Sequence, residues 1–172
     1  MVIEIFMLSI LRSGPMHGYE LKRRVQRPSS VPLSNNSLYP ALRRFEAAGL
    51  VTSAVEEQQG KPDRTVYSLT DAGRRHLTEL LSTLPLELAN DEEEFLVRVS
   101  FFGEIAPANR RAILAARLAA VDAAIAQVGD LLDPSSASVS REWRALTMGK
   151  VLERLHDERA WISELEQKAL QP

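Results

Sequence analysis

A mainly α-helical protein with one small β-hairpin is the fold class that this sequence predicts. Apolar residues recur every three or four positions through most of the 172 residues. Only residues 51–69 show alternating and β-branched residues around a Gly/Pro turn instead. Residues 1–82 hold eleven Lys and Arg against eight Asp and Glu, whereas residues 83–172 hold ten against fifteen. Because this asymmetry is typical of a nucleic-acid-facing domain joined to a different one, we expect domains over 1–84 and 86–172.

The composition excludes several classes of protein. With 45% hydrophobic and 26% charged residues, the chain is ordinary for a globular protein. It has no cysteine, so no disulfide framework, thiolate metal site or cysteine nucleophile is expected. The N-terminus lacks the basic region of a signal peptide, and the longest apolar run, residues 5–11, is far shorter than the ~20 residues of a membrane-spanning helix. We therefore expect a cytoplasmic protein with no membrane partner.

Three helices are predicted before the hairpin. The first has apolar residues at positions 3, 6, 7 and 10 and ends at Gly14-Pro15. The second covers about 17–26, and the third runs from about Ser34 to Ala48, with Gly49 just beyond its end. After the hairpin, Thr70 is placed to cap a fourth helix.

Pro40 lies inside the predicted third helix. An interior proline deletes a backbone hydrogen bond and costs ~3 kcal/mol or more. Either the helix begins near Ser37, with Pro40 in its first turn, or it begins near Ser34 and bends at Pro40. We favour the longer helix.

Three helices followed by two strands form a winged helix-turn-helix, in which the third helix enters the DNA major groove and the hairpin lies along the backbone or minor groove. One side of the third helix is apolar (Leu38, Ala41, Leu42, Phe45) and must face the core. On the other side, Arg43 can donate to a guanine edge or bind phosphate, and asparagine can read adenine. The expected DNA-binding residues are Tyr19, Ser34, Asn35, Asn36, Ser37, Tyr39, Pro40, Arg43 and Arg44, with Lys61 and Arg64 on the wing.

The second half is predicted to be helical throughout. Acidic residues from Asp91 onward suit the first turn of one helix, and Pro107 can begin another. Two heptad-like stripes predict homodimerisation through coiled-coil helices in residues 86–172, although part of the seam could instead pack within one subunit. The first stripe comprises Leu114, Leu118, Val121, Ile125, Val128 and Leu132, and the second comprises Met148, Val151, Leu155, Ile162 and Leu165.

Catalytic chemistry has no support in the sequence. There is no G-x-S-x-G, P-loop or G-x-G-x-x-G motif, and the three histidines lack metal-ligand spacing. We expect no catalytic residue, no metal and no cofactor. If a small effector binds, it should be apolar or aromatic and bind near the junction of the two halves. The residues available there are Phe102, Trp143, Met148 and Trp161, unless both tryptophans belong to the dimer core.

Three segments of the first 82 residues resemble the PadR family of bacterial transcriptional regulators. These are Gly14–Leu21, Ser37–Arg44 with Gly49-Leu50-Val51 after it, and Gly60-Lys61-Pro62 followed by Tyr67–Gly73. The second half resembles the helical C-terminal region of the longer PadR subfamily. The resemblance implies a homodimer that binds a pseudo-palindromic operator in double-stranded DNA, represses a nearby promoter and is often released by a small effector.

Two other functions stay open at this point. A winged helix can serve as a protein-interaction module, because a fold does not fix a function. The chain could also be a regulator that requires a different partner protein. A protein-binding version should carry acids or large aliphatic residues on the exposed side of its third helix, where this sequence has Asn36, Tyr39 and Arg43.

Overall fold

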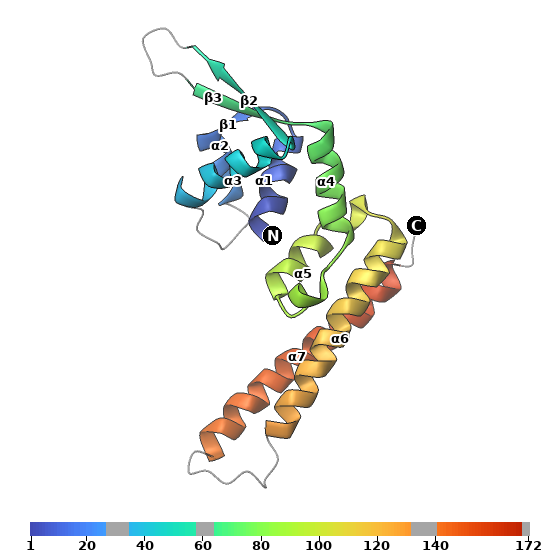
Figure 1. The fold of residues 1–172 in the computed structure, drawn as a ribbon. Helices are drawn as coiled ribbons and strands as arrows, with labels where there is room; N and C mark the ends of the chain where they lie inside the picture. Colours follow the sequence, from blue (N-terminus) through green and yellow to red (C-terminus); the bar gives the residue numbers. More distant parts are fainter. Residues whose placement is uncertain (27–34, 58–63, 132–140, 170–172) are drawn as a thin grey trace. The chain divides into compact units, whose positions relative to one another are not determined.

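The computed structural model describes residues 1–26, 35–57, 64–131 and 141–169 (Figure 1). It divides into two compact units, Met1–Leu81 and Ser82–Pro172. Ser34, Lys61 and Leu132, for which roles are expected, lie outside the described residues. The fold is mainly helical with a small antiparallel sheet, which confirms the predicted fold class.

The first unit has the element order of a winged helix-turn-helix. It contains α1 (Val2–Arg12), β1 (Met16–His17), α2 (Gly18–Val25), α3 (Asn35–Ala47), β2 (Val51–Glu56), β3 (Arg64–Leu69) and α4 (Asp71–Ser82). The strand that the sequence did not predict is β1, which pairs antiparallel with β3, so that the strand order is β1-β3-β2. Two residues are too few to show an alternating pattern, and only the tertiary pairing reveals this strand.

The longer form of α3 is confirmed, because Pro40 lies inside the helix. The apolar side of α3 faces the core as predicted, with Leu38, Ala41, Leu42 and Phe45 all buried. Gly49 has a φ of +69°, the left-handed conformation expected of a glycine just after a helix.

Thr70 joins the start of α4 to the end of α3 and the base of β2. Its Oγ1 atom accepts a hydrogen bond from the Gly73 amide at 3.0 Å, as expected of a capping residue. The same hydroxyl lies 2.7 Å from the carbonyl oxygen of Gly49 and 3.0 Å from that of Leu50. The Thr70 amide also donates to the Leu50 carbonyl at 3.0 Å. The junction between hairpin and helix is therefore held by several bonds at one point.

The second unit is a pair of long helices with shorter elements before it. These are the 3₁₀ turn Leu86–Leu88, α5 (Glu92–Val99), the 3₁₀ turn Phe102–Glu104, α6 (Pro107–Leu131) and α7 (Arg141–Ala169). Asp91 caps α5 by accepting from the amides of Glu93 and Glu94, and Pro107 begins α6 as predicted. Figure 1 shows α6 and α7 side by side, and ion pairs of 2.7 Å join Arg117 to Glu158 and Arg159 to Asp122.

The core of the second unit combines aromatic and buried charged groups. The ring of Trp161 meets Phe95 edge-on at 6.0 Å between centroids, and the guanidinium of Arg117 lies 5.6 Å from the Phe95 centroid. Arg98 is fully buried, and its Nη1 donates to the Glu94 carboxylate at 2.7 Å.

Part of the predicted dimer seam is buried inside one chain. Leu114, Val121 and Ile162 are buried within the single chain, which agrees with the alternative that part of the seam packs inside one subunit. A heptad repeat shows that a helix face is covered but not whether the covering helix belongs to the same chain. The other described positions keep partial exposure: Leu118, Ile125, Val128, Met148, Val151, Leu155 and Leu165.

By length and composition alone, α6 could cross a membrane, and it is the only such helix among the described residues. Its most apolar window has a mean hydropathy of 1.5 and is 22% buried. Uninterrupted apolar runs in the sequence do not reveal this helix, because scattered charged residues divide it. Helices that pair inside water-soluble proteins meet the same criterion, and α6 pairs with α7.

Candidate nucleic-acid interface

The polar side of α3 is accessible, as the sequence predicted. Asn36, Ser37 and Arg43 are exposed, Tyr39 is partly exposed, and Pro40 is half-buried between them. Asn35 is the first residue of the helix. Tyr39 and Arg43 are four residues apart and therefore share one face. This face offers an amide, two hydroxyls and a guanidinium, the groups that read base edges and bind phosphate.

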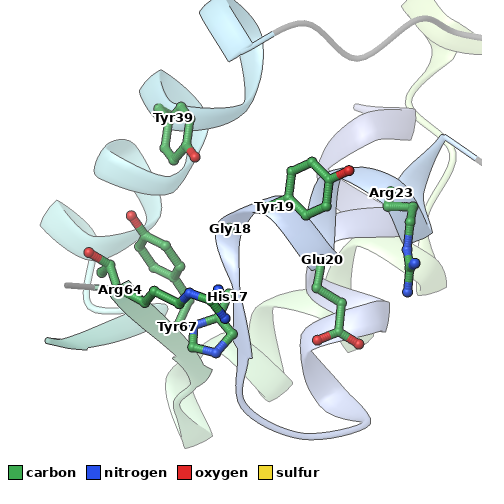
Figure 2. A pocket seen from close by; sticks show the side chains of 9 residues that line it. His17, Gly18, Tyr19, Glu20, Arg23, Tyr39, Arg64 and Tyr67 are labelled. Carbon is green, nitrogen blue, oxygen red and sulfur yellow. The ribbon is translucent and has the colours of Figure 1, made fainter. Parts of the chain in front are cut away.

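A half-open cavity of about 540 Å³ lies beside this face (Figure 2). It is formed by the start of α2, by α3 and by β3, and these elements meet because β1 pairs Met16 with Tyr67 and His17 with Val66 of β3. Tyr19, Tyr39 and Arg64 were expected from the sequence to bind DNA, whereas the other lining residues carried no such prediction. The full lining is His17, Gly18, Tyr19, Glu20, Arg23, Tyr39, Arg64, Thr65 and Tyr67.

Gly18 permits the close approach of two tyrosine rings. A Cβ atom at this position would lie 3.1 Å from Cε1 and 3.4 Å from Oη of Tyr39, and 3.4 Å from Cε2 of Tyr67. The rings of Tyr39 and Tyr67 thus pack over the first residue of α2, although they come from α3 and β3. In Figure 2 their hydroxyl groups lie in the space between these two elements.

The Tyr67 hydroxyl is kept as a hydrogen-bond donor. Burial raises the pKa of the Tyr67 phenol above its ordinary value of 10.0, and the neighbouring Tyr39 and Glu46 raise this pKa further, whereas Arg43 lowers it. A phenol is already protonated at neutral pH, and the raised pKa extends the range over which the Tyr67 hydroxyl can donate. The sequence pattern gives no functional signal at Tyr67, because the residue lies in a β-branched run that is typical of any strand. The register of β3 against β1 would have been needed to find it.

The charges around the cavity favour an anion. Arg23 and Arg64 supply two exposed guanidinium groups, and Tyr19 is 76% exposed at the rim. The one acid in the lining, Glu20, accepts from Arg24 at 2.6 Å, which offsets its negative charge.

Arg44 differs from its neighbour Arg43. Its Nη2 donates to the carboxylate of Glu4 in α1 at 2.8 Å, so this expected DNA contact is engaged by the body of the domain. Glu46 accepts a hydrogen bond from the Ser53 hydroxyl and so joins α3 to β2.

Trp143 and Trp161, two of the residues expected around an effector, lie far apart along α7. Trp143 is 74% exposed near the beginning of α7, whereas Trp161 packs on Phe95. Eighteen residues of α-helix, at about 1.5 Å per residue, separate them by ~27 Å, so one pocket within a single chain does not hold both. The second unit has a cavity of about 310 Å³, and its lining contains none of the four expected residues. Within the described ranges, no group of three acids or histidines is placed to hold a metal ion.

Comparison with known proteins points to one family. Residues 7–79 match the transcriptional regulator PadR-like family. An uncharacterized 37.1 kDa protein in transposon Tn4556 of Streptomyces fradiae is 36% identical over 74 residues, which are 43% of this chain and 20% of that protein. The negative transcriptional regulator PadR of Bacillus subtilis is 24% identical over 102 residues, 58% of this chain and 56% of that protein. The alignments thus span a fifth and about half of the lengths of these curated relatives.

Two solved structures are also similar. Bacillus subtilis PadR in complex with operator DNA aligns with 98% of this chain and 99% of that chain, at 22% identity and a TM-score of 0.44. A PadR family transcription regulator from Clostridium difficile R20291 aligns with 56% of this chain and 92% of that chain, at 30% identity and a TM-score of 0.41. With both TM-scores below 0.5, the family assignment rests on sequence. On the match over residues 7–79, the chain contains a domain of the PadR-like family, whose members are transcriptional regulators and not enzymes.

Proposed function

We propose that this regulator binds double-stranded DNA sequence-specifically as a homodimeric repressor in the cytoplasm and that a small effector releases it. The observation that carries DNA binding is the accessible polar face of α3 beside a cavity with two arginines. The operator complex of the Bacillus subtilis relative agrees with this function. The expected operator is pseudo-palindromic, because a two-fold dimer presents two copies of α3.

Arg43 and Lys61 have different roles in this proposal. Arg43 is exposed on the same face as Tyr39, where it can donate two hydrogen bonds to a guanine edge. Losing such a contact costs about 1–3 kcal/mol for each half-site and relaxes preference at one operator position. Lys61, near the tip of the wing in sequence, is assigned to the phosphate backbone. Its loss should weaken all sequences alike and lower the salt slope by about one unit per contact.

The test is binding of the wild type, Arg43→Ala and Lys61→Ala to a selected operator and to a scrambled duplex across a salt series. Arg111→Ala is the matched control, because Arg111 is an exposed arginine in α6. We expect the Arg43 variant to lose discrimination and the Lys61 variant to lose affinity for both duplexes. Equal small losses would indicate only a nonspecific basic surface. Unchanged binding in both variants would favour a protein-interaction module.

Homodimerisation is assigned to the second unit, with a second copy of this chain as the partner. Support comes from the large apolar side chains that a single chain leaves exposed at one end of α6 and α7: Leu131, Trp143 and Leu146 are each more than half exposed. Sedimentation equilibrium should show a dimer for the full chain and a monomer for residues 1–84. Trp143→Glu should weaken the dimer. A fragment of residues 1–84 that sediments as a dimer would place the interface elsewhere.

The effector is assigned to the second unit as an apolar or aromatic molecule. Trp143 and Trp161 report on separate places, so Trp143→Phe and Trp161→Phe identify which environment a ligand changes. Tryptophan fluorescence of both variants is titrated with a panel of planar aromatic compounds, and operator binding is measured in parallel. A flat fluorescence response with unchanged DNA binding would end this part of the proposal.

A further inference from the structure

The cavity beside α3 has a chemical character of its own, which DNA binding by α3 does not by itself explain. Its tyrosine hydroxyls come from three elements: Tyr19 from α2, Tyr39 from α3 and Tyr67 from β3. With Arg23 and Arg64 in the same lining, the cavity presents neutral donors and two cations. Donors of this kind bind phosphate oxygens, which account for about half or more of protein–DNA hydrogen bonds.

We propose that this cavity receives one backbone phosphate of each operator half-site, held between the hydroxyls of Tyr39 and Tyr67 and neutralised by Arg64. The inference rests on the proposed DNA binding and names which part of the DNA enters. The source of the phosphoryl group is the DNA backbone and not a free nucleotide.

The geometry at Gly18 supports a paired role for the two tyrosines. A Cβ atom added at Gly18 would lie 3.1–3.4 Å from both side chains, so the two rings lie close to the same residue. One hydroxyl is carried by the recognition helix and the other by the wing strand. A phosphate between them therefore fixes α3 and the wing against the same point of the DNA strand.

The size and charges of the cavity agree with this ligand. Its volume of about 540 Å³ leaves room for the sugar that carries the phosphate, and the cavity is half-open, as a continuous strand requires. Three acids lie nearby: Glu20 accepts from Arg24 at 2.6 Å, Glu46 accepts from the hydroxyl of Ser53, and the carboxylate of Glu56 lies 3.8 Å from Nε2 of His17.

The position of the phosphate along the operator follows from the helix. Tyr39 lies four residues before Arg43 on the same face of α3, a rise of about 6 Å. DNA advances about 3.4 Å per nucleotide along each strand. The phosphate should therefore lie within about two nucleotides of the base that Arg43 reads.

The experiment scans operator duplexes in which one phosphate at a time is replaced by an uncharged methylphosphonate. Binding is measured for the full-length wild type, Tyr39→Phe and Tyr67→Phe. Phenylalanine keeps the ring that packs over Gly18 and removes only the hydroxyl. Thr78→Ala is the control for hydroxyl loss, because the Thr78 hydroxyl bonds within α4 to the Arg74 carbonyl.

Loss of a hydrogen bond to a charged group should weaken operator binding about tenfold or more in each tyrosine variant, and Thr78→Ala should leave it unchanged. At one position per half-site, the methylphosphonate should strongly weaken operator binding by the wild type. In either tyrosine variant, the same methylphosphonate should cause little further loss of binding. That site should be the same for Tyr39 and Tyr67. Coupling at no position, or at different positions for the two tyrosines, would overturn the inference.

Other outcomes separate this inference from its premise. If the wild type does not discriminate operator from scrambled duplex, the proposed function fails before the phosphate is tested. A control titration uses inorganic phosphate and a nucleoside monophosphate without DNA. The wild type could bind one of these two anions saturably, lose that binding in both phenylalanine variants, and show no coupling to any methylphosphonate. That result would make the cavity a small-anion site and refute the DNA backbone as its ligand.

Discussion

Gly73 is the position where a single methyl group should do most damage to the DNA-binding unit. A Cβ atom there would lie 2.1 Å from the carbonyl oxygen of Leu50 and 2.6 Å from Cδ1 of Leu69. The nearest obstacle is backbone, which cannot rotate away as a side chain can. The first turn of α4 must therefore move off the base of the hairpin in a Gly73→Ala variant.

The cost can be worked out from the contacts that this movement disturbs. Inserting a methylene-sized group into a packed site costs about 1–3 kcal/mol. The displaced turn carries the Thr70 cap and its bonds to Gly49 and Leu50, and losing a helix cap costs ~1 kcal/mol. We expect Gly73→Ala to lower the free energy of unfolding by about 2–4 kcal/mol, a large share of the roughly 5–15 kcal/mol typical of native proteins.

Urea denaturation followed by far-ultraviolet circular dichroism measures this change as a lower midpoint. Gly149→Ala is the matched control, because a Cβ there has no heavy atom within 4 Å and the residue lies inside α7. An alanine in place of a helical glycine should raise stability by about 0.5–1 kcal/mol. A loss smaller than about 1 kcal/mol in Gly73→Ala would refute the argument that the Leu50 carbonyl blocks this position.

Three further predictions concern charge, titration and capping. Glu158→Gln should destabilise the second unit by about 3 kcal/mol, because it leaves the 6%-exposed Arg117 side chain without its charged partner. Asp122→Asn breaks the exposed pair with Arg159 and should cost less than about 1 kcal/mol. Equal urea midpoints for the two variants would contradict this difference. The pKa of Tyr67 is raised above 10.0 in the folded chain, so the stability that the protonated phenol contributes is present below pH 10.0 and is lost as the pH rises through the folded-state pKa. Above pH 10.0, Tyr67→Phe should therefore lose less stability than the wild type. If the free energies of unfolding of both proteins fall equally with pH, the raised pKa is contradicted. Asp91→Ala removes the acceptor for the amides of Glu93 and Glu94 and should lower the free energy of unfolding by about 1 kcal/mol in the same denaturation assay. Asp91→Asn should keep most of that stability, because asparagine also caps helices. An equal loss in both variants would mean that the cap is not the cause.

Local signals in the sequence were enough to predict most elements of the fold. Helical periodicity placed the helices, and alternation with a turn placed the two long strands. Gly49, Thr70 and Pro107 marked helix ends, because capping and backbone conformation depend on residues close in sequence. The apolar and polar sides of α3 followed from its period alone, so the exposed positions of Asn36, Tyr39 and Arg43 were predictable.

Tertiary contacts decided the parts of the site that depend on residues far apart in the chain. The cavity exists because β1 pairs with β3, and this pairing places Tyr67 beside Gly18 across about fifty residues of sequence. Arg43 and Arg44 look equivalent in the sequence, and only the ion pair with Glu4 separates them. Leu114, Val121 and Ile162 fit a heptad repeat, and they are buried within one chain. The repeat of apolar residues predicts which face of a helix is buried, because local helix geometry sets that face. Which helix packs against it depends on contacts between residues far apart in the sequence, and no short stretch of sequence contains these contacts.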